Sequence, residues 1–277
     1  MTGLDKLKRG IGKAMYWTYI TVITFWLLFP CLLIIYASFQ GTLDVSLIPE
    51  SLSFSSYRQI PSNYWESLWF TLMLAFSSAT LSLIITIPAS WSITRGNSGL
   101  NKLVNNIVMI PLVLPKIILG IALLLFFLPL RLTNSYYGIL LALIGTTGVP
   151  MAYRYLCAVI EGIDERLEQA ALSLGASRTV VLTRVTIPLM GPGIIVTWLL
   201  IFMTNFMNFL VIYFIAGPRA NPIAVRLFSD VVERGAMPHS LAMSAILIYV
   251  ALGFYFIVSV WLGPKYLSGV VFAKRET

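Results

Sequence analysis

Six long apolar stretches alternate with shorter polar segments along the chain. Each stretch holds enough residues to cross about 30 Å of hydrocarbon as an α-helix. The apolar runs are continuous, whereas the strands of a membrane barrel alternate apolar and polar residues over roughly ten positions. The pattern therefore predicts an all-α polytopic membrane protein that forms a single transmembrane domain over residues 1–277. We expect the spans at approximately residues 16–38, 67–93, 103–128, 136–160, 189–215 and 241–262.

Composition supports a lipid environment. Of the 277 residues, 58% are hydrophobic and 11% are charged, against about 25% charged residues in soluble domains. The net charge of +8 would favour nucleic acid as the partner of a soluble protein, but in a membrane protein it reflects basic residues at the cytoplasmic ends of spans. We therefore expect the lipid bilayer, and no nucleic acid, as a partner. The first apolar run is too long for the core of a signal peptide, so we expect it to be an uncleaved span.

The distribution of basic residues predicts the orientation. Six spans place both termini on one side of the membrane. With the N-terminus in the cytoplasm, thirteen of the 19 lysines and arginines lie on the cytoplasmic side, five lie outside, and Lys116 is left within a span. Because lysine and arginine accumulate in cytoplasmic loops, we expect both termini and the polar segment 161–188 to be cytoplasmic.

The segment 161–188 is polar yet helix-like, and it is longer than the roughly two to eight residues that suffice to join two helices. We expect one short helix from Asp164 to Leu174 that ends at Gly175, and a second helix that is capped by Ser177. The first helix carries an apolar stripe at helical spacing, formed by Leu167, Ala170, Ala171 and Leu174. This stripe can bind a partner outside the membrane, or it can rest on the chain's own helices or on lipid headgroups.

The same segment resembles a motif of the permease subunits of binding-protein-dependent ABC importers. In that family, Glu-Ala-Ala is followed after three residues by Gly and, after nine more, by a hydrophobic residue, any residue, a hydrophobic residue and Pro. The corresponding residues here are Gln169-Ala170-Ala171, Gly175 and Val185-Thr186-Ile187-Pro188, at the same spacing. Gln169 stands where the family has Glu, and Glu168 precedes it. The residues that the resemblance assigns to coupling are Glu165, Glu168, Gln169, Ala170, Ala171, Leu174, Gly175 and Pro188.

The resemblance implies a type I ABC importer permease fold and a division of labour. The chain would pair with a second permease subunit in a bacterial inner membrane. A cytoplasmic ATPase dimer would hold ATP and Mg²⁺ and grip the segment 161–188 as a coupling helix, and a periplasmic binding protein would deliver the solute. The chain has no Gly-x-x-x-x-Gly-Lys-Ser/Thr phosphate loop, so we expect a transport subunit without a cofactor rather than an enzyme.

Other functional classes lack the residues that they require. An ion-coupled secondary transporter or a channel needs an intramembrane carboxylate or a ring of charges, but residues 67–160 and 169–229 contain no carboxylate. A membrane-embedded enzyme needs a cluster of catalytic groups, whereas the one histidine lies in a polar loop. Two isolated cysteines in apolar runs predict no metal site and no disulfide framework.

Lys116 follows Pro115 inside the third span, and an ionisable residue within a membrane favours a functional role. The stretches 111–116 and 202–218 resemble the second permease of the polyamine, opine and phosphonate group. Polyamine members usually carry acids at the positions of Lys116 and of Met207-Asn208. We therefore expect a zwitterionic or anionic solute such as an aminoalkylphosphonate or an opine, with a polyamine such as putrescine or spermidine as the alternative.

Asn205 and Asn208 stand three residues apart on one face of the fifth span and can line the same pathway as Lys116. Each of these residues also has a structural interpretation. The lysine can extend to the interface or pair with a carbonyl or with a partner subunit, and the asparagines can form hydrogen bonds between helices.

Overall fold

The structure is a computed structural model that describes residues 3–40, 53–96 and 100–262. The described residues fall into two compact units. Among the described residues, the first unit contains 3–40, 53–62 and Asp230–Leu252, and the second contains 63–96, 100–229 and 253–262.

The described part of the chain is built from helices. In chain order they are α1 (Gly3–Ser38), α2 (Ser55–Arg58), α3 (Ser62–Arg95), α4 (Leu100–Val113), α5 (Lys116–Phe127), α6 (Tyr136–Leu143), the π-helical η1 (Ile144–Gly148), α7 (Val149–Glu161), α8 (Glu165–Ser173), α9 (Arg178–Val181), the π-helical η2 (Leu182–Thr186), α10 (Ile187–Phe206), α11 (Leu210–Ile215), α12 (Ile223–Arg234) and α13 (Pro238–Leu262).

Five stretches of helix are long and apolar enough to cross a membrane. They are Gly12–Ser38, Ser62–Arg95, Tyr136–Glu161, Arg178–Phe206 and Pro238–Ile257. A sixth crossing results if the bent pair Leu103–Val113 and Lys116–Phe127 counts as one span. The prediction of an all-α polytopic membrane protein is confirmed.

The third span differs from the expected continuous helix over 103–128. The two helices of the bent pair meet at 102°, and Pro115 between them has the extended dihedrals φ −57° and ψ 129°. Proline donates no backbone hydrogen bond and disfavours the helical conformation in the residue before it. The chain therefore turns at Leu114-Pro115, and Lys116 becomes the first residue of α5 rather than an interior residue of one continuous helix.

The fifth span begins and ends earlier than the expected 189–215. One helical stretch runs from Arg178 to Phe206, so the second helix of the polar segment continues through η2 into α10. Pro188 stands in the first turn of α10, two residues after η2 ends. Where a helix changes from π to α register, one backbone N–H is not needed as a hydrogen-bond donor, so a proline, which has no N–H, fits at this position. The helix then breaks at Met207–Phe209 before α11.

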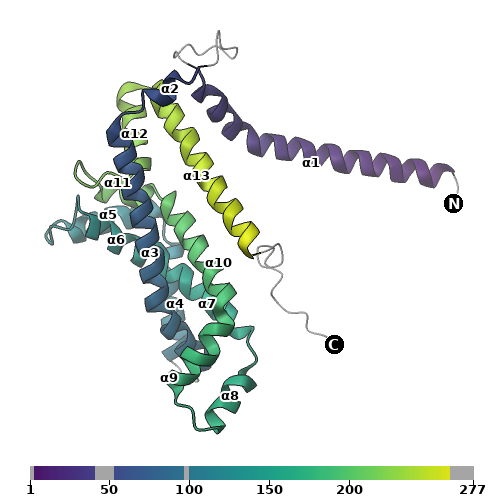
Figure 1. Ribbon diagram of the computed structural model, residues 1–277, viewed down its shortest axis with the longest axis vertical. Coiled ribbons are helices and arrows are strands. Elements are labelled where there is room, and N and C mark those ends of the chain that lie inside the picture. Colours follow the sequence, from purple (N-terminus) through teal and green to yellow (C-terminus); the bar gives the residue numbers. More distant parts are fainter. Residues whose placement is uncertain (1–2, 41–52, 97–99, 263–277) are drawn as a thin grey trace. The chain divides into compact units, whose positions relative to one another are not determined.

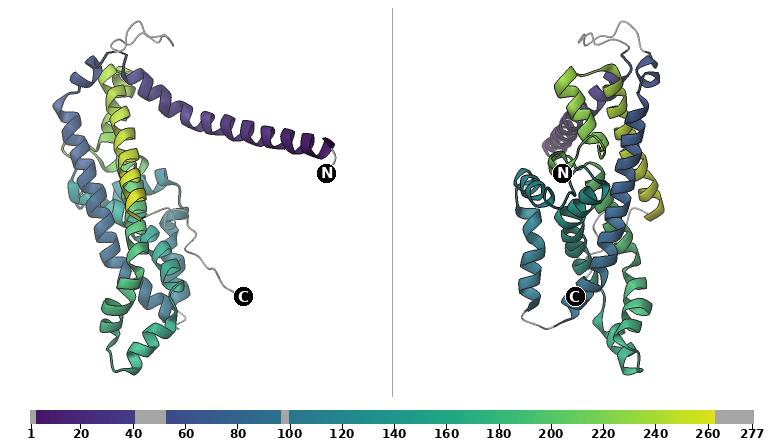
Figure 2. Two further views of the ribbon diagram at one scale, coloured as in Figure 1. Left: turned by 45° about the vertical axis from the view of Figure 1, so that its right-hand side comes forward. Right: turned by 90° about the vertical axis from the view of Figure 1, so that its left-hand side faces the viewer.

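In the first unit, the end of α1 is fixed to α2. The Ser38 hydroxyl lies 2.7 Å from the Tyr57 hydroxyl, and the Phe39 ring packs edge-on against Phe54 with ring centroids 5.3 Å apart. In the second unit, α3 runs beside α10 (Figures 1 and 2), where the Trp198 indole donates a hydrogen bond to Thr80 Oγ1 at 3.0 Å. The helices α8 and α9 lie at the end of the second unit near the end of α3 (Figure 1).

An apolar core within the second unit joins α3, α5, α6 and α11. Its largest members include Leu74, Phe127, Ile139, Leu143 and Ile212. Glycine allows the closest approaches between helices: Gly148 lies against Ser82 of α3, and Gly193 of α10 lies against Val159 of α7. Small residues at helix interfaces are the usual basis of close packing in membranes.

The packing of α10 on α7 predicts that Gly193→Ala destabilises the chain. An alanine Cβ at this position would lie 2.6 Å from Val159 Cγ2, and a β-branched side chain has little freedom to move away. Overpacking of this kind costs about 1–3 kcal/mol, so the melting temperature of the purified chain in detergent should fall.

Gly191→Ala is the matched control, because an added Cβ at that position has nothing within 4 Å and alanine favours helix more than glycine does. Its melting temperature should stay the same or rise. Adding Val159→Ala to Gly193→Ala should restore the lost stability. Equal melting temperatures for the two glycine variants would contradict the close approach of α7 and α10.

Candidate functional site

The helix α8 is delimited by local hydrogen bonds that its sequence supplies. Asp164 caps the helix by accepting a hydrogen bond from the Arg166 backbone N–H at 3.0 Å. Gly175 ends it with φ +87°, a left-handed conformation that glycine adopts without strain. Ser177 caps α9 by accepting from the Val180 backbone N–H at 3.4 Å. The predicted helix, turn and second helix are therefore present, and the short helix is rigid enough to present a defined surface.

One side of α8 is apolar and bare. Leu174 is 89% exposed and Leu167 is 51% exposed, and Ala170 between them is also exposed. Ala171, the fourth member of the predicted stripe, is only half-buried against the rest of the unit. Among the described residues, Leu174 is almost uncovered and Leu167 is about half covered, which argues against the interpretation that the stripe rests on the chain's own helices. The polar residues Glu165 and Gln169 lie on the exposed surface and bond to each other, with Gln169 Nε2 donating to Glu165 Oε1 at 3.2 Å.

Glu168 points in the opposite direction, into the protein. The residue is 4% exposed, and its carboxylate accepts hydrogen bonds from three side chains. Arg95 Nε donates to Oε2 at 3.0 Å, the Trp91 indole donates to Oε1 at 3.3 Å, and Thr186 Oγ1 donates to Oε1 at 2.8 Å. The sequence places Glu168 among the residues that face a partner, whereas the structure uses it to attach α8 to α3 and η2.

Arg95 extends this attachment to a third element. Its second guanidinium nitrogen donates to the carbonyl of Ile160 at 3.0 Å and to the carbonyl of Ile163 at 2.9 Å. The first carbonyl belongs to the end of α7 and the second to the turn that follows it, a region where helices leave carbonyl acceptors without intrahelical partners. The planar guanidinium can serve a carboxylate and two carbonyls together because its donors point in several fixed directions. One buried ion pair thus joins the ends of α3 and α7 to α8 and to the start of the fifth span.

Sequence reasoning missed Arg95 as a member of this site. Arginine directly after an apolar span is typical of a cytoplasmic anchor, and the residue stands 73 positions before its partner. The position of Glu168 on the helix could have indicated that this carboxylate does not face the partner. It shares a helical face with Ala171 and therefore lies off the centre of the bare stripe.

Two polar side chains of the spans, Lys116 and Asn208, point toward η1. Lys116, at the start of α5, directs Nζ toward the carbonyl of Thr146 at 3.5 Å. Asn208, at the break after α10, directs Nδ2 toward the hydroxyl of Thr147 at 3.5 Å. The structure therefore brings together two of the three residues that the sequence predicts for a solute pathway, at the points where three spans depart from regular α-helix.

Asn205 lies elsewhere. Its side chain is 1% exposed, and Nδ2 donates to the Ser78 hydroxyl of α3 at 2.9 Å. This is the hydrogen bond between helices that the sequence offered as the alternative to a pathway position. Its amide oxygen is buried without a hydrogen-bond partner among the described residues.

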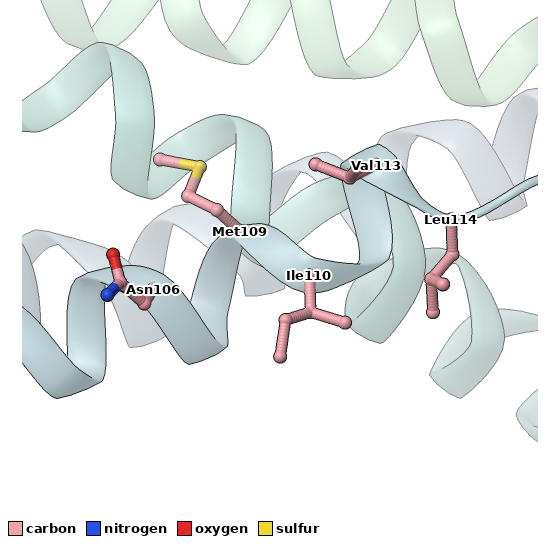
Figure 3. Close-up of a pocket in the computed structure, with 5 residues that line it drawn as sticks. All are labelled: Asn106, Met109, Ile110, Val113 and Leu114. Carbon is pink, nitrogen blue, oxygen red and sulfur yellow. The ribbon is translucent and has the colours of Figure 1, made fainter.

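A shallow hollow of about 290 Å³ lies along α4, just before the bend at Pro115. Figure 3 shows the side chains that line it, which project from one helix and the turn that follows it: Asn106, Met109, Ile110, Val113 and Leu114. Its lining holds one amide and no charged group, so it does not match the charged solutes that the sequence suggests.

Comparison with known proteins agrees with this architecture. Residues 84–265 match the family described as "Binding-protein-dependent transport system inner membrane component". The spermidine/putrescine transport system permease protein PotC of Haemophilus influenzae is 25% identical over 236 residues, which cover 84% of this chain and 91% of that protein. The molybdenum transport system permease protein ModB of Escherichia coli K12 is 30% identical over 158 residues, which cover 51% of this chain and 69% of that protein.

Solved structures share the fold. A chain of a bacterial ABC transporter involved in the import of the acidic polysaccharide alginate matches with a TM-score of 0.74 at 18% identity, over 95% of this chain and 99% of that chain. A chain of the inward-facing MetNI methionine ABC transporter matches with a TM-score of 0.62 at 18% identity, over 71% of this chain and 93% of that chain. Because the family match spans more than half of the sequence and includes α8 with the spans around it, the chain belongs to the family of inner membrane components of binding-protein-dependent transport systems.

Proposed function

We propose that this chain is a permease subunit of an ATP-driven importer and that α8 is the element gripped by a separate cytoplasmic ATPase. The observation that carries the proposal is the bare apolar side of α8. Leu174 is 89% exposed at the end of a helix that is capped at its start and anchored through Glu168. A rigid helix that presents leucines outward matches a partner's groove better than it matches solvent.

The family assigns the chain to multi-pass inner membrane transport subunits rather than to enzymes, and such a subunit holds no cofactor of its own. Energy must then come from other chains. The proposal places ATP and Mg²⁺ on an ATPase dimer, solute capture on a periplasmic binding protein, and the other half of the pathway on a second permease subunit. The alginate transporter with a similar fold is described in complex with a substrate-bound periplasmic protein, which supports this composition.

The proposed orientation puts both termini and α8 in the cytoplasm, because most lysines and arginines then lie inside. Closure of the ATPase dimer would move α8. The ends of α3, α7 and α10 would follow, and the tilt of these spans would switch the pathway from inward-facing to outward-facing. ATP hydrolysis and release of its products would return the pathway to the inward-facing state.

Two classes of solute each have one observation in their favour. The comparisons favour a polyamine, because PotC proteins of several bacteria, described as spermidine/putrescine permeases, match over most of this chain at 24–25% identity. We place this class first. A polyamine needs carboxylates or an aromatic cage, and since residues 67–160 and 169–229 contain no carboxylate, the second permease and the binding protein would have to supply the acids.

The second class is a zwitterionic or anionic solute such as an aminoalkylphosphonate or an opine. Lys116 supports it, because the cation stands at a helix break beside η1 and Asn208 stands at another break nearby. A cation together with freed backbone N–H groups at the start of α5 favours an anionic group.

Docking through α8 predicts that Leu174→Asp prevents co-purification of the ATPase with the chain. The exposed side chain supports little of the chain's own fold, so the purified chain should keep its melting temperature. Loss of a buried apolar anchor typically costs about 2 kcal/mol or more, or roughly thirtyfold in Kd. Leu130→Asp, which changes another exposed leucine in the turn after α5, is the matched control and should retain the ATPase.

The turn after α8 gives a second test of docking. Gly175→Pro is incompatible with φ +87° and removes the hydrogen bond from the Gly175 N–H to the Leu172 carbonyl, so it should also release the ATPase. Gly235→Pro makes the same change at φ +81° outside the segment 161–188 and should retain it. Failure of the unaltered chain to bring down any ATPase would refute the proposed function.

The charge at position 116 separates the two solute classes. If the solute is anionic, Lys116→Glu places like charges together and should lower uptake of 2-aminoethylphosphonate by roughly a hundredfold, with the assembled complex unchanged in amount. If the solute is a polyamine, the same substitution should preserve or increase uptake of putrescine. Lys116→Gln is the control for the loss of the side chain's charge alone. The measurement is accumulation of the two labelled solutes in proteoliposomes that hold the complete transporter.

A further inference from the structure

The buried carboxylate of Glu168 lies where four helical segments meet. It comes from α8, two of its donors come from the last two turns of α3, and the third comes from the last residue of η2. Through Arg95 the same pair holds the end of α7. Figure 1 shows these segments together at one end of the second unit.

The backbone alone provides a weaker connection for α8. Three residues, Gly162–Asp164, join it to α7, and the turn around Gly175 joins it to α9. The helix α3 is far away in sequence, and both hydrogen bonds that the described residues make between α3 and α8 end on the Glu168 carboxylate. A push on the outer side of α8 can therefore reach α3 through this carboxylate.

The geometry at η2 strengthens the connection to the fifth span. The Thr186 hydroxyl contacts both the Glu168 carboxylate, at 2.8 Å, and the carbonyl of Val181 five residues earlier, at 3.4 Å. The wider π turn thus presents Thr186 toward α8 directly before α10 begins. Segments of π-helix within longer helices are frequent at functional positions.

A buried ion pair is not a general means of stabilising a fold, because apolar residues of similar volume often do as well. What the pair supplies is a fixed orientation: a carboxylate with three donors and a guanidinium with three acceptors can be satisfied in one arrangement of the four segments. Leucine or alanine at these positions would let α8 slide or rotate on the unit.

We propose that Arg95 and Glu168 are positioning residues that link α8 mechanically to α3, α7 and α10, so that movement imposed on the outer side of α8 is transmitted to the spans. The proposal rests on the proposed function, since it needs a motor that moves α8. It separates two roles on one helix. The bare side with Leu174 binds the ATPase, and the buried side with Glu168 transmits the motion.

The direct test measures whether α3 and α8 move together. Cysteines placed at Ser92 of α3 and Ser173 of α8, both exposed, carry spin labels in a chain whose native Cys31 and Cys157 are replaced by alanine. The distance between the labels is measured in the complete transporter, nucleotide-free and after trapping with ATP and vanadate. With the ion pair intact, the distance should be the same in both states. With Glu168→Gln it should change or broaden on trapping.

A second readout is the number of solute molecules transported per ATP hydrolysed, with putrescine and 2-aminoethylphosphonate as the probes. Coupling free energies between sites typically correspond to roughly 5- to 150-fold effects, so Glu168→Gln should lower this ratio about tenfold while ATP hydrolysis continues. Thr186→Val keeps the ion pair, removes one donor and should lower the ratio by less. Glu66→Gln, which alters an exposed carboxylate near the start of α3 and outside the segment 161–188, should leave both readouts unchanged.

The outcomes distinguish the two proposals. ATPase bound to Glu168→Gln, with a shifted label distance and a low transport ratio, supports the linkage. ATPase bound with wild-type distance and ratio overturns the linkage and leaves the docking proposal intact. If Glu168→Gln fails to assemble, Thr186→Val decides through the transport ratio, and a wild-type ratio in that variant overturns the linkage. Absence of any ATPase from the unaltered chain overturns both proposals.

Discussion

The second unit depends on one buried ion pair at the ends of its helices. Glu168 and Arg95 lie 3.0 Å apart, with the carboxylate side chain almost fully buried. Removing one partner of such a pair leaves an uncompensated buried charge and costs about 3–5 kcal/mol. This interaction orients α8 on the unit, and the orientation of α8 in turn decides which of its residues face outward. The bare leucines, and thus the proposed docking surface, follow from it.

A nine-residue helix is too short to be stable alone in water, so α8 needs the interactions at its boundaries. The Asp164 cap and the left-handed Gly175 define its length, and the Glu168 carboxylate defines its rotation. The result is a rigid short helix outside the membrane spans. A helix of this kind can carry a load between a soluble partner and the spans, which a flexible loop of the same length could not do.

The spans of the second unit are irregular at four places: the turn at Pro115, the π-helical η1, the π-helical η2 and the break after Phe206. Each irregularity frees backbone groups, which in lipid must be satisfied within the protein. Lys116 and Asn208 lie at two of these places, and both point toward η1. Polar side chains and irregular backbone thus occur together in the part of the unit where a solute pathway is proposed.

The sequence predicted what local chemistry determines. Continuous apolar runs gave the spans, Asp164 and Ser177 gave the starts of α8 and α9, and Gly175 gave the turn between them. It also singled out Lys116 and Asn208, because charged and amide groups stand out in apolar segments, and their role in a solute pathway stays a proposal. These predictions need no knowledge of the tertiary contacts.

Features that depend on distant residues were not predictable in the same way. Glu168 looked like an exposed carboxylate on a polar helix, and its true direction depends on Arg95 from the end of another span. Pro188 stands inside a continuing helix, and that position depends on the π turn before it. The third span bends by 102°, an angle that Pro115 permits but does not specify. Asn205 forms its hydrogen bond with Ser78 of α3 and does not point toward η1 as Asn208 does, because α3 supplies a hydroxyl beside it.

The most direct measurement of the central claim is an experimental structure of the complete transporter in nucleotide-free and ATP-bound states. The account predicts that Leu167 and Leu174 are buried against the nucleotide-hydrolysing subunit in both states, and that the Glu168 carboxylate stays within hydrogen-bonding distance of Arg95 while α8 moves. A structure in which α8 points away from that subunit, or in which α8 moves after separating from Arg95, would contradict it.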